Sequence, residues 1–176
     1  MKNNINRIKL IISDVDGVWT DGSIYIMNDK TEIKKFSVLD GVGVVMAKIA
    51  DIKIALISGR FSKATETRAK ELNIKDVFNG TLNKLPVYEN LKKKYKLNDN
   101  QIAYIGDDLI DISIMKKVAF PICVSNANVQ VKEISVYKTK LLGGQGAFRE
   151  AVEWILMKQG RLENIFSIMD QNVQKM

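Results

Sequence analysis

An apolar run that stops at two aspartates decides the fold: residues 8–17 read Ile8-Lys9-Leu10-Ile11-Ile12-Ser13-Asp14-Val15-Asp16-Gly17. The apolar part has the composition and length of one buried strand. The two carboxylates that follow it, at i and i+2, do not both belong to a core, because burying unpaired charge costs too much free energy. The stretch predicts a buried strand and a loop that presents Asp14 and Asp16 to a hard cation or as an acid/base couple. Taken alone, it also fits a turn or a calcium loop.

Two later apolar runs end in the same way. Residues 54–57 lead into Ser58, and residues 102–105 lead into the loop of Asp107. Strands separated by helical segments form a parallel sheet with helices on both faces, and ligands collect at the carboxyl ends of such strands. We therefore expect an α/β fold with three layers, doubly wound around a mostly parallel, Rossmann-like sheet, that gathers Asp14, Ser58 and Asp107 in one crevice.

The other segments complete this fold. The remaining expected strands are 23–27 and 32–38, which form a hairpin around Asn28-Asp29-Lys30, and then 77–78 and 120–124. The expected helices are 41–49, 62–72 with Ser62 as its cap, one carrying Leu85, Tyr88, Leu91 and Tyr95 on one face, one that ends at Lys117, and one after Gly146. We expect one domain over residues 1–176, with a C-terminal tail at about 162–176 that is amphipathic at first and then polar.

The composition narrows the chemistry. The 176 residues are 46% hydrophobic and 27% charged, a normal globular balance. There is no histidine, which excludes catalytic triads, general bases and metal sites that depend on histidine. The single cysteine, Cys123, has no internal partner for a disulfide. Any hydrolysis must therefore use carboxylates and a metal held by oxygen ligands.

The charge balance indicates the kind of partner. The formal net charge is +7, from 27 lysines and arginines against 20 aspartates and glutamates. The lysines, as in Lys92-Lys93-Lys94, lie along helical faces without interleaved aromatic residues, which favours a solvated surface over nucleic-acid binding. The same sign of charge suits an anionic small substrate. No apolar run approaches the ~20 residues that span a bilayer and no signal peptide precedes the first one, so we expect no membrane partner and a cytoplasmic location.

Phosphoryl transfer suits the aspartate pair. An aspartate with an ordinary pKa of about 3.9 is ionised at neutral pH, so Asp14 needs no base to act as a nucleophile. A neighbouring carboxyl whose pKa is raised by burial and like charge can protonate a leaving alkoxide. This reaction demands mainly positioning and neutralisation of the phosphate oxygens.

Further polar residues at the strand ends supply that positioning. Asp107, Asp108 and Asp111 can hold Mg²⁺ together with Asp14, while Ser58 and Lys84 can donate to phosphate oxygens. Each has a simpler interpretation: the aspartates as helix caps, Ser58 as a cap or turn, and Lys84 as a surface lysine. Their order along the chain, each at a strand end, favours a magnesium-dependent phosphatase.

This ordered set resembles the haloacid dehalogenase superfamily of phosphatases, whose motifs are an Asp-x-Asp nucleophile pair, a Ser or Thr, a Lys and an acidic cluster. The matching residues are Asp14 and Asp16, Ser58, Lys84, and the cluster Asp107, Asp108 and Asp111. By that resemblance, Asp14, the backbone carbonyl of Asp16, and Asp107 would ligate Mg²⁺, with Asp108 and Asp111 supporting the metal shell.

The chain is similar, over most of its length, to the capless branch of 3-deoxy-D-manno-octulosonate 8-phosphate phosphatases. Only 36 residues separate Asp21 from Ser58, enough for a hairpin but not for a cap domain. The resemblance implies a sugar-acid phosphate substrate, contacts to it from Gly59, Arg60 and Arg68, and a homotetramer with the 23–38 hairpin at its interface. Trp19 resembles instead a sister branch that acts on nine-carbon acids such as 2-keto-3-deoxy-nononate 9-phosphate.

Two other classes of function compete with this prediction. A receiver-type signalling module also groups acidic residues, a Ser or Thr and a Lys at strand ends, but its phosphoacceptor follows a mid-chain strand. A non-catalytic partner of a sugar-activating enzyme would keep the fold without turnover, and the presence of every motif residue argues against it.

Overall fold

The centre of the molecule is one parallel sheet. The computed structural model describes residues 4–174. The sheet has six strands in the order β5-β4-β1-β6-β7-β8, and every neighbouring pair is parallel. The strands are β1 (Leu10–Ser13), β4 (Lys53–Ser58), β5 (Asp76–Asn79), β6 (Ile102–Gly106), β7 (Phe120–Cys123) and β8 (Tyr137–Lys138). The strand β1 lies between β4 and β6, so the loop that follows it occupies the middle of the carboxyl edge.

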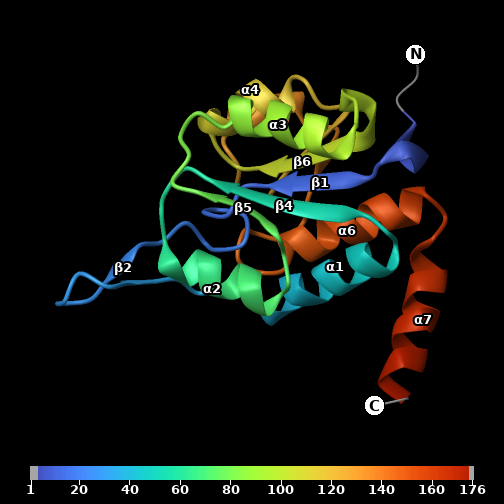
Figure 1. Cartoon of the computed structure of the whole chain (residues 1–176), viewed down its shortest axis with the longest axis horizontal. Coiled ribbons are helices and arrows are strands. Elements are labelled where there is room, and N and C mark those ends of the chain that lie inside the picture. The colour runs from blue at the N-terminus through green and yellow to red at the C-terminus, as the bar shows by residue number, and fades with distance from the viewer. Residues whose placement is uncertain (1–3, 175–176) are drawn as a thin grey trace.

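Helices cover both faces of this sheet, which confirms the expected three-layer α/β fold. In Figure 1, α1, α2 and α6 lie below the sheet, and α3 and α4 lie above it. The helices are α1 (Val38–Ile49), α2 (Lys63–Glu71), α3 (Leu85–Tyr95), α4 (Ile112–Met115), α5 (Val129–Ile134), α6 (Ala147–Lys158) and α7 (Leu162–Gln174), with 3-10 turns η1 (Ile5–Arg7), η2 (Asp99–Gln101) and η3 (Leu109–Asp111). No helix within residues 4–174 is long and apolar enough to cross a bilayer.

The core explains why the central strands read as continuous apolar runs. All residues of β1, β6 and β7 are buried, as expected for strands covered on both faces. Below the sheet, the ring of Trp19 lies 4.3 Å from that of Phe148 on α6, and its indole N–H donates to Ser13 Oγ at 3.0 Å. The loop after β1 is therefore anchored to the core through Trp19.

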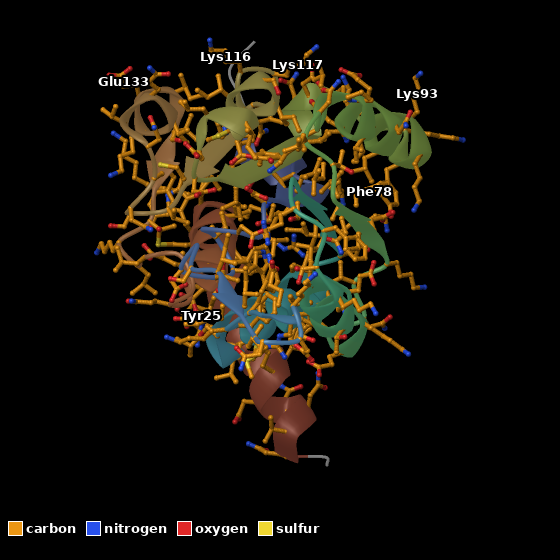
Figure 2. All side chains as sticks on the ribbon, turned by 90° about the vertical axis from the view of Figure 1, so that its left-hand side faces the viewer. Tyr25, Phe78, Lys93, Lys116, Lys117 and Glu133 are labelled. Atoms are coloured by element: carbon orange, nitrogen blue, oxygen red, sulfur yellow. The ribbon has the colours of Figure 1, made fainter. Side chains whose placement is uncertain are left out.

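A hairpin projects from the carboxyl edge of the sheet. Its strands are β2 (Tyr25–Ile26) and β3 (Glu32–Ile33), paired antiparallel, and Figure 1 shows it extending to the left, away from the body. Figure 2 looks onto this end, with Tyr25 labelled on the hairpin. Both strands are much shorter than the predicted 23–27 and 32–38, because most hairpin side chains are exposed and no second layer supports further pairing.

Several predicted boundaries were wrong. Helix α1 begins at Val38, three residues before the predicted start, because the side chain of Ser37 caps it by accepting from the N–H of Leu39. Ser62 is at the N-cap position of α2, but its hydroxyl makes no capping hydrogen bond. The helix expected to end at Lys117 starts as the turn η3 and ends at Met115.

The segments 129–134 and 137–138, for which we predicted no element, form α5 and β8. The C-terminal segment forms α7, whose Ile165 is buried against the body while Phe166 and Val173 remain exposed.

Candidate active site

The fold brings the predicted strand ends together. Asp14 follows β1, Ser58 ends the neighbouring strand β4, and Asp107 follows β6 on the other side. These residues surround a cleft of about 450 Å³ at the carboxyl edge, which Asp14, Asp16, Gly59, Arg60 and Asp107 help to line. The prediction that distant stretches meet in one crevice holds for Asp14 and Asp107, whereas Ser58 is buried next to the cleft, with its Oγ 3.1 Å from Asp16 Oδ2.

Asp14 is buried and held by two donors. Its Oδ1 accepts from the backbone N–H of Val15 at 2.7 Å and lies 2.8 Å from Lys84 Nζ. Burial, with a contribution from the charge of Asp111, raises the pKa of Asp14 to about 7, while Lys84 acts in the opposite direction. Cations near this carboxylate therefore decide whether it is ionised, and ionised is the state in which it can attack phosphorus.

Lys84 lies beneath Asp14, not on the surface. Lys84 is 1% exposed, and its Nζ lies 2.8 Å from both Asp14 Oδ1 and Asp111 Oδ1. Burial lowers the pKa of Lys84, but the charges of Asp14 and Asp111 outweigh this effect and the net pKa is raised. The interpretation of Lys84 as a surface lysine is wrong: it is a fixed positive charge at the floor of the cleft.

Asp111 organises this floor. Its Oδ1 accepts from Tyr104 Oη at 2.6 Å and from Lys84 Nζ, while its Oδ2 accepts from the backbone N–H groups of Asp107 at 3.0 Å and Asp108 at 3.3 Å. Because both oxygens are engaged, Asp111 fixes Lys84 and the loop of Asp107 relative to each other. The side chain of Asp108 accepts from the N–H of Leu109 at 2.8 Å, so for this residue the capping interpretation is confirmed.

The acidic cluster fits a divalent cation. Oxygens of Asp14, Asp107 and Asp111 all lie within 4.8 Å of one another. Asp107 Oδ1 is buried without a hydrogen-bond partner, and a Cβ placed on Gly17 would lie 2.0 Å from Asp107 Oδ2. Burial, then the charges of Asp14 and Asp111, raises the pKa of Asp107 to about 8. Hard cations such as Mg²⁺ prefer oxygen ligands of this kind, and Asp14 and Asp107 are the side chains placed to hold one.

Asp16 faces a different set of partners. Its Oδ1 forms an ion pair with Lys34 of the hairpin, and its Oδ2 lies 3.1 Å from Ser58 Oγ. The carboxylate of Asp16 is not part of the acidic cluster found among the described residues, and contact of its backbone carbonyl with a metal stays a prediction.

The predicted substrate contacts divide into two groups. Gly59 and Arg60 line the cleft, and Arg60 Nε pairs with Glu32 Oε2 at 2.5 Å. Arg68 lies on α2, where it bonds Glu71 and the carbonyl of Ser37, and does not line the cleft of its own chain. A role for Arg68 in substrate binding stays a prediction.

Within the part of the chain that the structure describes, Glu32, Lys34 and Tyr104 are among the residues that bond to site residues and were not foreseen. Glu32 lies on β3 and Lys34 follows two residues later. Because side chains two residues apart in an extended segment lie on the same face, this spacing is the signal that could have placed them together. Tyr104 carries no comparable signal, because a tyrosine inside an apolar strand reads as core.

Known proteins share both the sequence and the fold. The family described as haloacid dehalogenase-like hydrolase matches residues 11–142. The 3-deoxy-D-manno-octulosonate 8-phosphate phosphatase KdsC of Escherichia coli K12 is 40% identical over 157 residues, 89% of this chain and 84% of the relative. The Moraxella catarrhalis phosphatase of the same name, solved with magnesium, phosphate and KDO, has a TM-score of 0.90 at 38% identity and covers 94% of this chain and 95% of its own. A cobalt-bound Haemophilus influenzae relative has a TM-score of 0.86 at 38% identity, covering 90% and 92%.

Proposed function

Because the chain belongs to the haloacid dehalogenase-like hydrolases, in the family of 3-deoxy-D-manno-octulosonate 8-phosphate phosphatases, we propose that it hydrolyses this sugar phosphate to 3-deoxy-D-manno-octulosonate and inorganic phosphate. The observation that carries the proposal is the site itself. A buried nucleophile, Asp14, lies between a fixed cation, Lys84, and an acidic cluster that fits Mg²⁺.

The proposed reaction proceeds in two steps. Asp14 attacks phosphorus, so an Asp14–phosphorus bond forms as the bond from phosphorus to the ester oxygen breaks, and Asp16 gives its proton to that oxygen. Water then attacks the phosphorus of the aspartyl-phosphate while Asp16 takes a proton from it, and the bond between phosphorus and the Asp14 oxygen breaks, which releases phosphate and restores Asp14. Bound Mg²⁺ would neutralise phosphate oxygens and thereby let two anions approach each other.

Fixed donors would hold the transferred phosphate. Gly59 lines the cleft, Ser58 Oγ lies next to it at 3.1 Å from Asp16 Oδ2, and Lys84 provides positive charge beside Asp14. Lys84, which Asp14 and Asp111 hold in place, acts without reorganising during the reaction, which makes it effective in a site screened from water.

The substrate is proposed to be the eight-carbon acid phosphate. Arg60 at the cleft wall offers a cation to an anionic sugar. Trp19, the residue that resembled the nine-carbon branch, is 1% exposed and packs on Phe148, so it does not line the cleft. The nine-carbon alternative therefore has no support from the geometry.

A substrate panel tests this function. Purified protein with Mg²⁺ should turn over 3-deoxy-D-manno-octulosonate 8-phosphate with a higher kcat/KM than the nine-carbon 9-phosphate or a generic aryl phosphate. Equal or lower turnover of the octulosonate substrate would contradict the assignment. Long-lived phosphorylation by acetyl phosphate without turnover would instead favour a receiver module.

We also propose a homotetramer whose interface includes the hairpin, acting in the cytoplasm as one catalytic domain. Tyr25, Ile26 and Met27 are 49%, 65% and 52% exposed, a cluster of large apolar side chains that monomers rarely present to water. Native mass spectrometry should give four chains. A monomer would contradict the prediction.

A further inference from the structure

We propose that Lys34 is a positioning residue that orients the carboxylate of Asp16 for proton transfer to the leaving group. The inference rests on the proposed function, since it concerns the first step of that reaction. It arises from an ion pair that joins the projecting hairpin to the loop after β1.

The side chain of Lys34 is buried although the hairpin that carries it is largely exposed. It is 3% exposed, whereas Tyr25 and Ile33 on the hairpin strands are 49% and 46% exposed. A buried ammonium is unfavourable unless it is paired, and here it pairs with Asp16 and lies 3.6 Å from Glu32 Oε1. The hairpin thus places one charged group against the site.

Asp16 depends on this group for its orientation. Its Oδ1 pairs with Lys34 and its Oδ2 lies 3.1 Å from Ser58 Oγ. The Ser58 hydroxyl has one proton and a closer acceptor, the carbonyl of Arg60 at 2.7 Å, so it is the weaker anchor. The ammonium of Lys34 carries three protons and has carboxylates as its acceptors.

Orientation matters because a general acid must meet the ester oxygen within hydrogen-bond distance. With Oδ1 held by Lys34, Oδ2 is the oxygen left to exchange a proton with the leaving group once Ser58 turns to the phosphate. In its acid form, Asp16 carries the proton on Oδ2 while Oδ1 still accepts from Lys34 Nζ. This proton moves to the ester oxygen while the bond between phosphorus and that oxygen breaks. Without Lys34 the carboxyl can rotate away.

Glu32 holds Lys34 in place from the other side. Its Oε2 pairs with Arg60 Nε at 2.5 Å, and its Oε1 faces Lys34 at 3.6 Å. The hairpin is therefore tied to the cleft wall by two ion pairs, so a Lys34 variant also removes one attachment of the hairpin. The experiment must separate that effect from orientation of Asp16.

A comparison of two substrates separates loss of Asp16 orientation from detachment of the hairpin. We expect Lys34→Met to lower kcat/KM about 10- to 100-fold for the sugar phosphate, whose alkoxide needs a proton to leave. For p-nitrophenyl phosphate, whose leaving group needs little protonation, we expect a loss under about threefold. The parameter kcat/KM reports only the steps through ester cleavage, so hydrolysis of the aspartyl-phosphate does not enter. Lys35→Met, at the exposed neighbouring lysine, is the matched control and should leave kcat/KM for both substrates unchanged.

A double-mutant cycle identifies the partner. In an Asp16→Asn background, Lys34→Met should lower kcat/KM for the sugar phosphate by less than about twofold, because the effects of substituting two residues that act together are not additive. Lys34→Arg, which keeps the charge, should restore part of the sugar-phosphate activity. If Lys34→Met unfolds the protein, Lys34→Gln replaces it in the same assays.

Equal losses on both substrates, no loss at all, or additive losses with Asp16→Asn would overturn the proposal for Lys34. These outcomes leave wild-type hydrolysis of the sugar phosphate intact. Failure of the proposed function would instead appear as lack of that hydrolysis in the wild-type enzyme.

Discussion

Asp14 shows how far a single residue depends on its neighbours. Burial raises its pKa to about 7, while Lys84 at 2.8 Å favours the ionised form. An isosteric amide keeps the shape of this side chain but is not a nucleophile. We expect Asp14→Asn to lower kcat more than about 100-fold, which corresponds to about 3 kcal/mol or more of activation free energy. The far-ultraviolet circular dichroism of the variant should equal that of the wild type, because the fold is kept.

The measurement is steady-state hydrolysis of the sugar phosphate with saturating Mg²⁺. Retention of more than about a hundredth of the wild-type rate would rule out nucleophilic catalysis by Asp14.

Lys84 is the residue whose loss should affect both stability and activity. Its removal leaves the buried carboxylates Asp14 and Asp111 facing each other without a cation. Leaving buried charge uncompensated destabilises a protein by about 3–5 kcal/mol. We expect Lys84→Met to lower the free energy of unfolding by about 3 kcal/mol and kcat by at least about 100-fold.

Urea unfolding of the metal-free protein checks the first effect. Lys93→Met is the control, since Lys93 is exposed on α3 and Figure 2 shows it pointing outward. Ordinary surface substitutions change the free energy of unfolding by less than about 0.5 kcal/mol. A change of only that size in Lys84→Met would contradict a stabilising role for the ion pairs of Lys84.

Elements meet at Asp40, which joins α1 to α6. Asp40 is fully buried in the first turn of α1, and its Oδ1 accepts from the N–H of Arg149 in the first turn of α6 at 3.2 Å. Its Oδ2 has no hydrogen-bond partner. Burial raises the pKa of Asp40 to about 6, although backbone N–H groups of α6 and the charge of Arg68 lower it.

This raised pKa gives a pH dependence of stability. An aspartate in the unfolded chain titrates near pH 4, so between about pH 4 and 6 the folded state binds the additional proton. Acidification through that window therefore favours folding, and the contribution is lost as the pH rises through 6. On going from pH 7.5 to 5, the stability of the wild type relative to Asp40→Asn should rise by about 1 kcal/mol.

Urea unfolding of both proteins at the two pH values tests this, because other titrating groups cancel in the difference. A difference that is constant between pH 7.5 and 5 would show that Asp40 titrates normally.

The sequence predicts the elements of this fold where burial and periodicity agree. The strands that became β1, β4, β6 and β7 were foreseen because full burial on both faces produces continuous apolar runs. The helix face of Leu85, Tyr88, Leu91 and Tyr95 was foreseen from its helical spacing. The short elements α5 and β8 were missed because two to six residues contain too little pattern, and tertiary packing against β7 decides their form.

The site follows the same division. Asp14, Ser58 and Asp107 were foreseen because topology alone brings strand ends together. The burial of Lys84 and the pairing of Lys34 with Asp16 depend on side-chain packing across the cleft, which spacing along the chain does not encode. Lys84 was thus predicted as a site residue from the sequence, but its burial and the contact of Lys34 with Asp16 are visible only in the structure.

At the scale of the whole molecule, the acidic cluster links metal binding to folding. Three carboxylates within 4.8 Å of one another repel each other in the metal-free protein, and this repulsion contributes to the raised pKa of Asp107, about 8. A cation that binds the folded chain and not the unfolded one stabilises it by RT ln(1 + [L]/Kd), about 2.7 kcal/mol at 100 times Kd. Saturating Mg²⁺ should therefore raise the unfolding midpoint by several degrees.

Asp107→Asn should be more stable than the wild type, or equally stable, without Mg²⁺ and less stable than the wild type with Mg²⁺. Without metal, the variant loses a buried, repelled carboxylate and is expected to be at least as stable as the wild type at pH 8. With metal, it has lost a ligand and should gain little. The two melting curves, recorded by calorimetry with Mg²⁺ or EDTA, are thus expected to reverse in order. If both proteins gained equally from Mg²⁺, the cation would be binding elsewhere and Asp107 would not be its ligand.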